Sequence, residues 1–176
     1  NVHLKLKKRV KNLVTFIIPR HTQRTEDIVN SFRDLDLKVH CHSSKENIRK
    51  DTDIYIVDTY GETNSFFKAI NIVFLGGSFV SKGGHNPIEP AINNCVIITG
   101  QHVYNWQNIY EDMLKNNACF LFNKISILEE KIKKLFKNNN EMNKMKENAK
   151  KLTQKNFFDS NKLIYIIKNL IEAGPC

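Results

Sequence analysis

Short apolar runs alternate with amphipathic stretches along most of this chain, and this alternation constrains the fold more than any other feature of the sequence. The apolar runs are Leu13–Ile18, Leu37–His40, Ile54–Val57, Ile72–Leu75, Val96–Ile98 and Cys119–Phe122. They are rich in β-branched and aromatic residues with few polar interruptions, which is typical of parallel strands buried on both faces. We therefore predict an α/β fold with a Rossmann-like, doubly wound parallel sheet.

Amphipathic stretches separate these runs and continue through the last third of the chain. Those between the predicted strands lie near Glu26–Asp34, Glu62–Ile70, Ile88–Ile92 and Trp106–Leu114. Further helical patterns follow at Ile125–Leu135, Met142–Leu152 and Leu163–Leu170, with a break expected at Asn138–Asn140. We predict that these form extra C-terminal helices beyond the sheet.

The beginning of the chain departs from the usual order of such a fold. Val2–Val10 is predicted to be the end of a helix, whereas a doubly wound domain normally opens with a strand. We therefore expect that the opening strand is missing and that the chain is part of a longer protein. We predict one domain over residues 1–173 and a loose tail at 174–176. No apolar run reaches the roughly 18–20 residues of a membrane helix, so we expect this chain to be soluble.

Two glycine pairs lie in a loop after the predicted strand Ile72–Leu75; residues 76–87 are called the glycine-rich loop below. Gly76-Gly77-Ser78 opens it, and Gly83-Gly84 precedes Asn86-Pro87, a good N-cap followed by a good first helical residue. Paired glycines let backbone N–H groups approach a ligand, and a helix N-terminus attracts phosphate. The pattern favours a phosphate site, to which the Ser78 hydroxyl could add a donor. An ordinary tight loop is the alternative.

Glu89 occupies the third predicted helical position after the Asn86 cap. A glutamate there either caps the helix, by accepting a hydrogen bond from a backbone N–H group, or accepts hydrogen bonds from both hydroxyls of a ribose. The local pattern does not decide between these two roles.

Other polar segments also follow predicted strands: Pro19-Arg20-His21, Asp58–Glu62 and Gly100–Asn105. Arg20 carries a fork of donors suited to phosphate or a base edge, and His21 either titrates near neutral pH or only hydrogen-bonds a loop. Asp58 and Thr59 could instead cap the helix predicted from Glu62. Because ligands bind at the carboxyl ends of strands in open α/β sheets, we expect these segments and the glycine-rich loop to form one site.

The formal net charge of +9 arises largely from lysines between Lys131 and Lys155. Solvated helix faces explain such a run; an anionic membrane is the alternative, and the absence of interleaved arginine and aromatic residues argues against nucleic acid. The cysteines contain no CxxC pair, which argues against zinc and thioredoxin-like chemistry and fits a reducing compartment. Cys95 and Cys119 are predicted to be buried. Without a P-loop lysine, an HExxH motif or a serine-triad pattern, we predict no metal and no cofactor.

At these residues the chain resembles the C-terminal domain of the Kdo (3-deoxy-D-manno-octulosonic acid) transferases, which are GT-B glycosyltransferases. The resemblance covers most of Leu13–Leu114. The matching segments are Pro19-Arg20-His21, Asp58–Glu62, Gly76–Ala91, and Gly100, His102 and Asn105. The departures are Tyr60 for a common Met, Ser81-Lys82 for a common Pro-Arg, and Gln101 for a usual Pro.

The resemblance implies a nucleotide-sugar (donor) binding domain over residues 1–173. It also implies an inverting, metal-independent transfer of Kdo from CMP-Kdo to a lipid A precursor in lipopolysaccharide synthesis. The family works at the cytoplasmic face of the inner membrane of Gram-negative bacteria. Its membrane anchor, its acceptor domain and its catalytic base lie in an N-terminal part that this chain lacks, so no catalytic residue is assigned here.

The residues implied for donor binding are Pro19, Arg20, His21, Tyr60, Gly61, Glu62, Gly76, Gly77, Ser78, Gly83, Gly84, Asn86 and Glu89. In this assignment Gly76, Gly77, Ser78 and Asn86 surround the phosphate, while Arg20 contacts the nucleotide and Glu89 holds the ribose. Two alternatives stay open. One is another GT-B enzyme that uses a UDP-sugar, either a transferase or an epimerase. The other is a noncatalytic module that binds an acidic partner through its lysine-rich helices.

Overall fold

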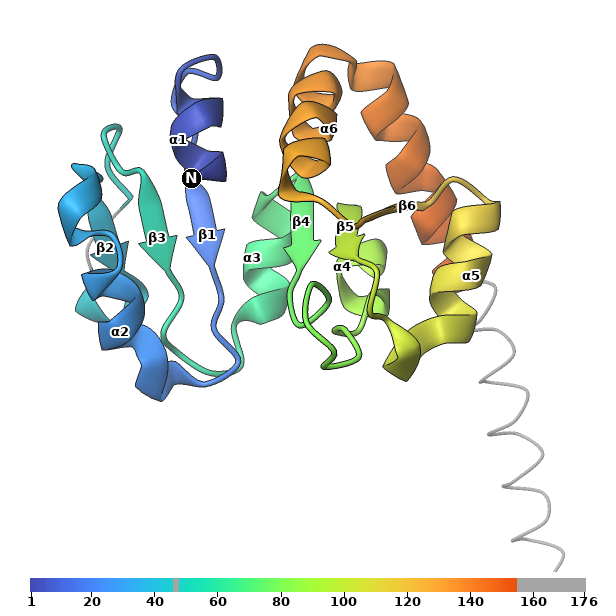
Figure 1. The fold of residues 1–176 in the computed structure, drawn as a ribbon, viewed down its shortest axis with the longest axis horizontal. Coiled ribbons are helices and arrows are strands. Elements are labelled where there is room, and N and C mark those ends of the chain that lie inside the picture. Colours follow the sequence, from blue (N-terminus) through green and yellow to red (C-terminus); the bar gives the residue numbers. More distant parts are fainter. Residues whose placement is uncertain (46–47, 155–176) are drawn as a thin grey trace, which may run out of the picture. The chain divides into compact units, whose positions relative to one another are not determined.

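The computed structural model describes residues 1–45 and 48–154, and helices and strands alternate along it (Figure 1). The chain divides into two compact units, Asn1–Phe66 and Phe67–Cys176, called unit 1 and unit 2 below. The single domain over residues 1–173 stays a prediction. The helix predicted at Leu163–Leu170 and the tail at 174–176 lie outside the described residues.

Unit 1 is built on a parallel sheet with the strand order β1-β3-β2. The strands are β1 (Thr15–Ile17), β2 (Val39–Cys41) and β3 (Ile54–Ile56). Its helices are α1 (Val2–Lys7) and α2 (Thr25–Asn30), with short 3-10 turns η1 (Thr22–Arg24), η2 (Arg33–Leu35) and η3 (His42–Ser44). All three residues of the central strand β3 are buried, which accounts for its apolar sequence.

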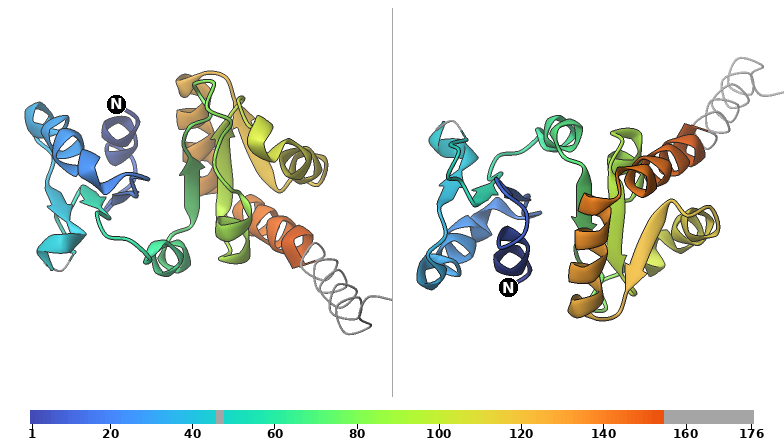
Figure 2. Two further views of the ribbon diagram at one scale, coloured as in Figure 1. Left: turned by 90° about the horizontal axis from the view of Figure 1, so that it is seen from below. Right: turned by 90° about the horizontal axis from the view of Figure 1, so that it is seen from above.

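Unit 2 is built on a second parallel sheet with the strand order β4-β5-β6. The strands are β4 (Ile72–Leu75), β5 (Val96–Gly100) and β6 (Cys119–Phe122). The boundary between the units falls within α3 (Thr63–Ala69). The other elements of unit 2 are α4 (Ile88–Ile92), η4 (Tyr104–Trp106), α5 (Gln107–Lys115), α6 (Ile125–Lys137) and a helix over 139–154. Helix α6 and the helix at 139–154 lie on opposite sides of the sheet (Figure 2).

The structure confirms the parallel α/β fold, and a strand is found in each predicted apolar run. These strands form two separately hydrogen-bonded sheets, which the alternation of elements alone could not specify. The predicted break at Asn138–Asn140 is wrong in its extent, because only Asn138 is non-helical. Its side-chain oxygen accepts a hydrogen bond from the Glu141 backbone N–H at 3.1 Å, and so caps the helix that follows.

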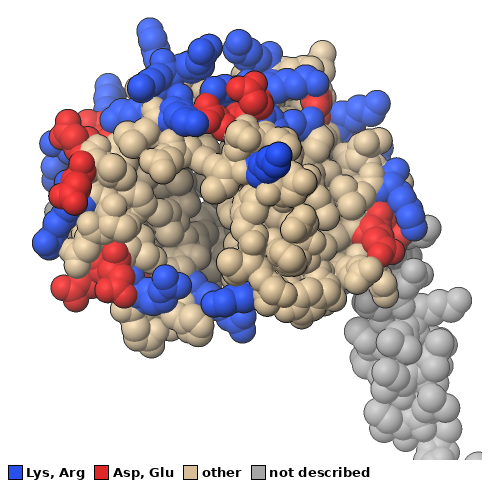
Figure 3. Space-filling model, viewed as in Figure 1, with Lys and Arg blue, Asp and Glu red and all other residues tan. Residues whose placement is uncertain are grey.

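Ion pairs reduce the positive charge of the lysine-rich helices. Lys131 Nζ lies 2.8 Å and Lys134 Nζ 3.5 Å from the Glu141 carboxylate, and Lys133 pairs with Glu129. Acidic side chains therefore lie among the Lys and Arg side chains near α6 (Figure 3). Lys146 is buried and donates to Asn71 Oδ1 at 2.5 Å. No helix in the described part of the chain is both long and apolar enough to cross a membrane.

The predicted burial of two cysteines is confirmed. Cys95 and Cys119 are 0% and 3% exposed, and burial raises their pKa values to about 11 and about 12. Both therefore stay protonated near neutral pH and act as small apolar groups of the unit 2 core.

Candidate functional site

The glycine-rich loop lies at the carboxyl end of β4, between β4 and α4 (Figure 1). Gly77, Gly83 and Gly84 have φ angles of +69°, +83° and +71°, a conformation that residues with a Cβ rarely adopt. The Gly84 backbone N–H donates to the Gly77 carbonyl at 3.2 Å and so joins the two glycine pairs. The folded shape of the loop thus depends on these glycines.

Ser78 links the loop to the end of the neighbouring strand β5. Its buried hydroxyl donates to the Leu75 carbonyl at 2.8 Å and accepts the Gly100 N–H at 2.7 Å. The Ser78 carbonyl accepts the His102 N–H at 2.9 Å. A Cβ on Gly100 would collide with that carbonyl. Because the hydroxyl proton is already donated to the Leu75 carbonyl, the Ser78 side chain supports the loop. A ligand would therefore contact the backbone of Ser78 and not its hydroxyl.

Helix α4 begins one residue later than predicted, with Pro87 as its N-cap residue and Ile88 as its first helical residue. Asn86 nevertheless caps the helix, because its Oδ1 accepts the Ile88 N–H at 2.9 Å. The helix has only five residues, so its dipole contributes less attraction for phosphate than the sequence pattern suggested.

Glu89 is the second helical residue, and its side chain is exposed. Within residues 1–45 and 48–154, its carboxylate has one side-chain contact, a long 3.5 Å approach from Asn86 Nδ2, and no backbone N–H caps it. The carboxylate is therefore open to solvent and to a ligand, and its role as a ribose acceptor stays a prediction.

Gly76 differs from the other glycines of the loop. Its φ angle is not in the left-handed region, and a Cβ placed on it would meet no atom within 4 Å. The fold therefore does not require glycine here. The space beside this backbone is open, as a site for a closely approaching ligand would need.

In unit 1 the structure brings two predicted segments together at the ends of the neighbouring strands β1 and β3. The Thr22 hydroxyl, just after Pro19-Arg20-His21, donates to the Tyr60 hydroxyl at 3.2 Å, and this bond lowers the pKa of Tyr60. Arg20 and His21 are exposed. Gly61 has a φ of +86° and open space around it. The sequence analysis expected all of these segments to form one site. Because the segments belong to both units, that expectation stays a prediction.

Two side chains that the sequence analysis missed hold the Asp58–Glu62 segment in unit 1. The Asp58 carboxylate accepts the Ser43 N–H at 2.8 Å and the Ser43 hydroxyl at 2.5 Å. Glu62 lies 3.1 Å from His42 Nε2 and also accepts the Thr59 hydroxyl. His42 and Ser43 follow β2, so the strand-end rule used for the other segments, applied to the run at Leu37–His40, would have found them.

These contacts favour the ionised carboxylates. Burial alone would raise the pKa of Asp58, but the two hydrogen bonds from Ser43, the Asp58 backbone N–H and the nearby His42 together outweigh it and hold that pKa below its ordinary value. Hydrogen bonds from Thr59 and His42 lower the pKa of Glu62. Asp58 thus bonds η3 rather than capping α3, the role considered from the sequence.

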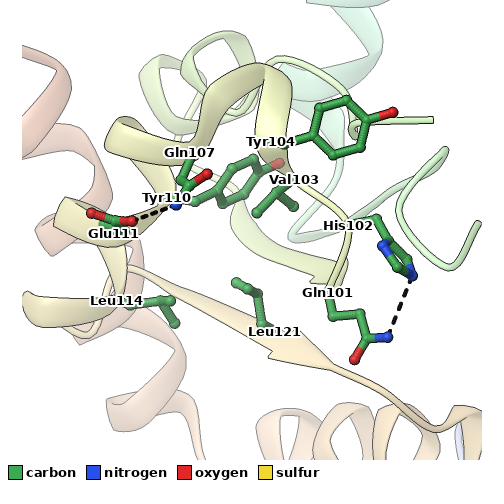
Figure 4. Close-up of a pocket in the computed structure, with 9 residues that line it drawn as sticks. All are labelled: Gln101, His102, Val103, Tyr104, Gln107, Tyr110, Glu111, Leu114 and Leu121. Carbon is green, nitrogen blue, oxygen red and sulfur yellow. Dashed lines mark hydrogen bonds between the residues drawn. The ribbon is translucent and has the colours of Figure 1, made fainter. Parts of the chain in front are cut away.

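A cavity of about 300 Å³ lies beside the segment that follows β5 (Figure 4). It is lined by Gln101, His102, Val103, Tyr104, Gln107, Tyr110, Glu111, Leu114 and Leu121. Gln107 Nε2 donates to Glu111 Oε1 at 2.9 Å. None of the residues predicted to bind the donor lines this cavity, although His102 and Tyr104 belong to the Gly100–Asn105 segment. Across the described ranges, no group of three or more His, Cys, Asp or Glu side chains is arranged to hold a metal ion.

Comparison with known proteins gives consistent relatives, although no family profile matches the chain. It is 32% identical to 3-deoxy-D-manno-octulosonic acid transferase of Rickettsia typhi over 166 residues, which are 93% of this chain and 36% of that protein. It is 31% identical to a bifunctional glycosyltransferase/methyltransferase of Fusobacterium nucleatum over 159 residues, 89% of this chain and 23% of that protein. The chain thus spans about a third or less of these relatives.

A solved structure has the same fold. The C-terminal CMP-Kdo binding domain of WaaA from Acinetobacter baumannii matches 87% of this chain and 80% of that chain, with a TM-score of 0.82 and 23% sequence identity. The fold of this chain is therefore that of a GT-B C-terminal domain.

Proposed function

Because the chain is homologous to the 3-deoxy-D-manno-octulosonic acid (Kdo) transferases over about a third of their length, we propose that it is the donor-binding domain of such an enzyme. The enzyme would transfer Kdo from CMP-Kdo to a lipid A precursor, with inversion and without a metal. The observation that carries this proposal is the agreement of sequence and fold: relatives named as Kdo transferases cover 93% of the chain, and a CMP-Kdo binding domain shares its fold.

Within unit 2, the glycine-rich loop would receive the phosphate of the donor. Gly76 supports this role because its backbone faces open space, and Gly77 and Ser78 follow it directly. Fixed backbone donors near the phosphate stabilise the negative charge that develops as CMP leaves, and this lowers the barrier. Asn86 and Glu89 lie at the end of the same loop, where an exposed carboxylate could accept the ribose hydroxyls.

Within unit 1, the loop after β1 would contact the nucleotide. Arg20 offers several N–H donors from an exposed position. Tyr60 is tied to this loop through Thr22, so Pro19, His21, Gly61 and Glu62 belong to the same proposed surface.

The acceptor site and the general base would lie in the rest of the enzyme, since the chain spans about a third of the relatives. The full-length enzyme would work at the cytoplasmic face of the inner membrane. This chain would also contact an anionic membrane. The exposed lysines Lys137, Lys144, Lys150 and Lys151 support this proposal, whereas the ion-paired lysines of α6 do not.

Calorimetric titration with CMP and with UMP tests the proposal. Saturable binding of CMP, with UMP at least about tenfold weaker (about 1.4 kcal/mol), is the expected result. Preference for UMP or a UDP-sugar would favour another GT-B enzyme instead. Binding of neither nucleotide, combined with salt-sensitive binding to anionic vesicles, would favour a noncatalytic module.

A second test is an assay of Kdo transfer from CMP-Kdo to a lipid A precursor. The chain alone should show no transfer.

A further inference from the structure

The segment after β5 buttresses the glycine-rich loop of unit 2. Besides the bonds from Gly100 and His102 to Ser78, two residues of this segment and one residue of α5 donate to backbone carbonyls farther along the loop. The Tyr104 hydroxyl donates to Ser81 O at 3.1 Å, Asn105 donates to Lys82 O and Gly83 O, both at 3.2 Å, and the Tyr110 hydroxyl donates to His85 O at 3.0 Å.

Asn105 acts on the loop in three ways at once. Its side-chain amide donates to the Lys82 carbonyl, and its backbone N–H donates to the Gly83 carbonyl. The same amide also packs directly on the Gly83 Cα, where a Cβ would collide with it. The two peptide groups that flank Gly83 are therefore both hydrogen-bonded to Asn105, while the φ angle of Gly83 is +83°.

The effect of Asn105 passes through this turn to the other glycine pair. Gly84 follows Gly83 directly, and its N–H bonds to the Gly77 carbonyl. We infer that Asn105 is a positioning residue: it fixes the Gly83-Gly84 turn, and through it the Gly77 backbone, in the conformation that receives the phosphate of a cytidine nucleotide. This inference rests on the proposed function for the identity of the ligand.

The test compares Asn105→Ala with Asn108→Ala in the same chain. Asn108 is an exposed residue of α5 whose side chain makes no hydrogen bond within the described residues, so it controls for loss of an asparagine nearby. The first measurement is amide hydrogen exchange without nucleotide. Asn105→Ala should speed exchange of the Gly84 amide several-fold while β4, β5 and β6 keep their protection. Asn108→Ala should leave the Gly84 amide unchanged.

The second measurement is CMP affinity. Losing one hydrogen bond that orders the loop should raise the Kd for CMP about fivefold in Asn105→Ala. Tyr104→Phe, which removes only the bond to the Ser81 carbonyl, should raise it less. The thermal unfolding midpoint should stay close to that of the Asn108→Ala control, because Asn105 is exposed.

A double variant isolates the packing of Asn105 on Gly83. Gly83→Ala forces a collision with the Asn105 amide, and Asn105→Ala removes the group it collides with. Gly83→Ala/Asn105→Ala should therefore bind CMP no more weakly than Gly83→Ala alone. If the two residues acted independently, their fold-changes would multiply.

Unchanged exchange at Gly84 in Asn105→Ala overturns the inference. Faster exchange throughout the sheet overturns it too, because Asn105 would then support unit 2 in general. Faster exchange at Gly84 with an unchanged Kd also overturns it, since the loop would move without effect on the ligand. If the wild-type chain binds no CMP, the proposed function fails, and the Gly84 exchange rates alone decide whether Asn105 fixes the turn.

Discussion

The candidate loops of the two units are held in place by different chemistry. In unit 2 the glycine-rich loop is fixed by backbone carbonyls, a buried hydroxyl and close approaches that leave no room for a Cβ, at Gly83 and Gly100. In unit 1 the loop after β3 is fixed by the carboxylates of Asp58 and Glu62, which bond side chains after β2. Steric fit should make the first loop sensitive to small substitutions, whereas charge should make the second sensitive to pH.

The largest effect is expected where a methyl group has no room. Gly100→Ala should lower the free energy of unfolding by about 3 kcal/mol, because the new Cβ would collide with the Ser78 carbonyl. Gly76→Ala is the matched control: its Cβ enters open space, so stability should change by less than about 0.5 kcal/mol. Urea unfolding followed by fluorescence of Trp106, which lies in unit 2, measures both. Equal losses would contradict the steric account.

Gly76→Ala also separates folding from binding. The same open space is where the phosphate of the nucleotide is proposed to lie, so this variant should fold normally and yet bind CMP several-fold more weakly. An unchanged Kd for CMP would remove Gly76 from the proposed site.

Glu89→Ala should weaken CMP binding by about 10- to 150-fold, because an ionised carboxylate that accepts ribose hydroxyls contributes roughly 1.5–3 kcal/mol. A helix-capping role, which the structure does not show, would instead cost about 1 kcal/mol of stability. An analogue of CMP without both ribose hydroxyls distinguishes the two roles. The wild-type chain should bind it poorly, and Glu89→Ala should bind it no worse than the wild type does. Equal weakening for CMP and the analogue would refute the ribose role.

Ser78→Ala should cost about 1–2 kcal/mol of stability, since it leaves the buried Gly100 N–H without its acceptor. The Kd for CMP should change by less than about threefold, because the hydroxyl proton is committed to Leu75. Ser81→Ala, in the exposed part of the same loop, is the control for both measurements. A large loss of CMP affinity without loss of stability would instead place the Ser78 hydroxyl on the ligand.

The smallest effect is expected from acidification, and it should appear in unit 1. Because the folded-state pKa of Asp58 is lowered, its contribution is complete above its unfolded pKa of about 4 and is lost as the pH falls below that value. For this half-buried group we expect about 0.5–1 kcal/mol. Exchange of the Ser43 amide, corrected for intrinsic rates, should therefore lose protection between about pH 5 and pH 3. The Gly84 amide of unit 2 should lose less, and Asp58→Asn should weaken Ser43 protection already at pH 7.

The sequence predicted the strands and the position of the glycine-rich loop because both depend on local patterns: buried apolar runs and glycines that adopt positive φ. It did not predict the bond between Ser78 and Gly100 or the packing of Asn105 on Gly83, because these join residues about 22 positions apart. It also missed His42 and Ser43, whose importance comes from the pairing of β2 with β3. Pro87 and Asn138 show that helix ends follow capping geometry, which the sequence indicates only to within a residue or two.

The central claim is that the glycine-rich loop of unit 2 receives the phosphate of a cytidine nucleotide, and a CMP titration followed by amide NMR tests it most directly. Saturable shifts at Gly76, Gly77 and Ser78 and at 86–89, with a further shift at Arg20, are the predicted result. A matched titration of Gly76→Ala should reach the same end point at higher CMP concentration. Shifts confined to α6 and the helix at 139–154, or shifts that never saturate, would contradict the claim.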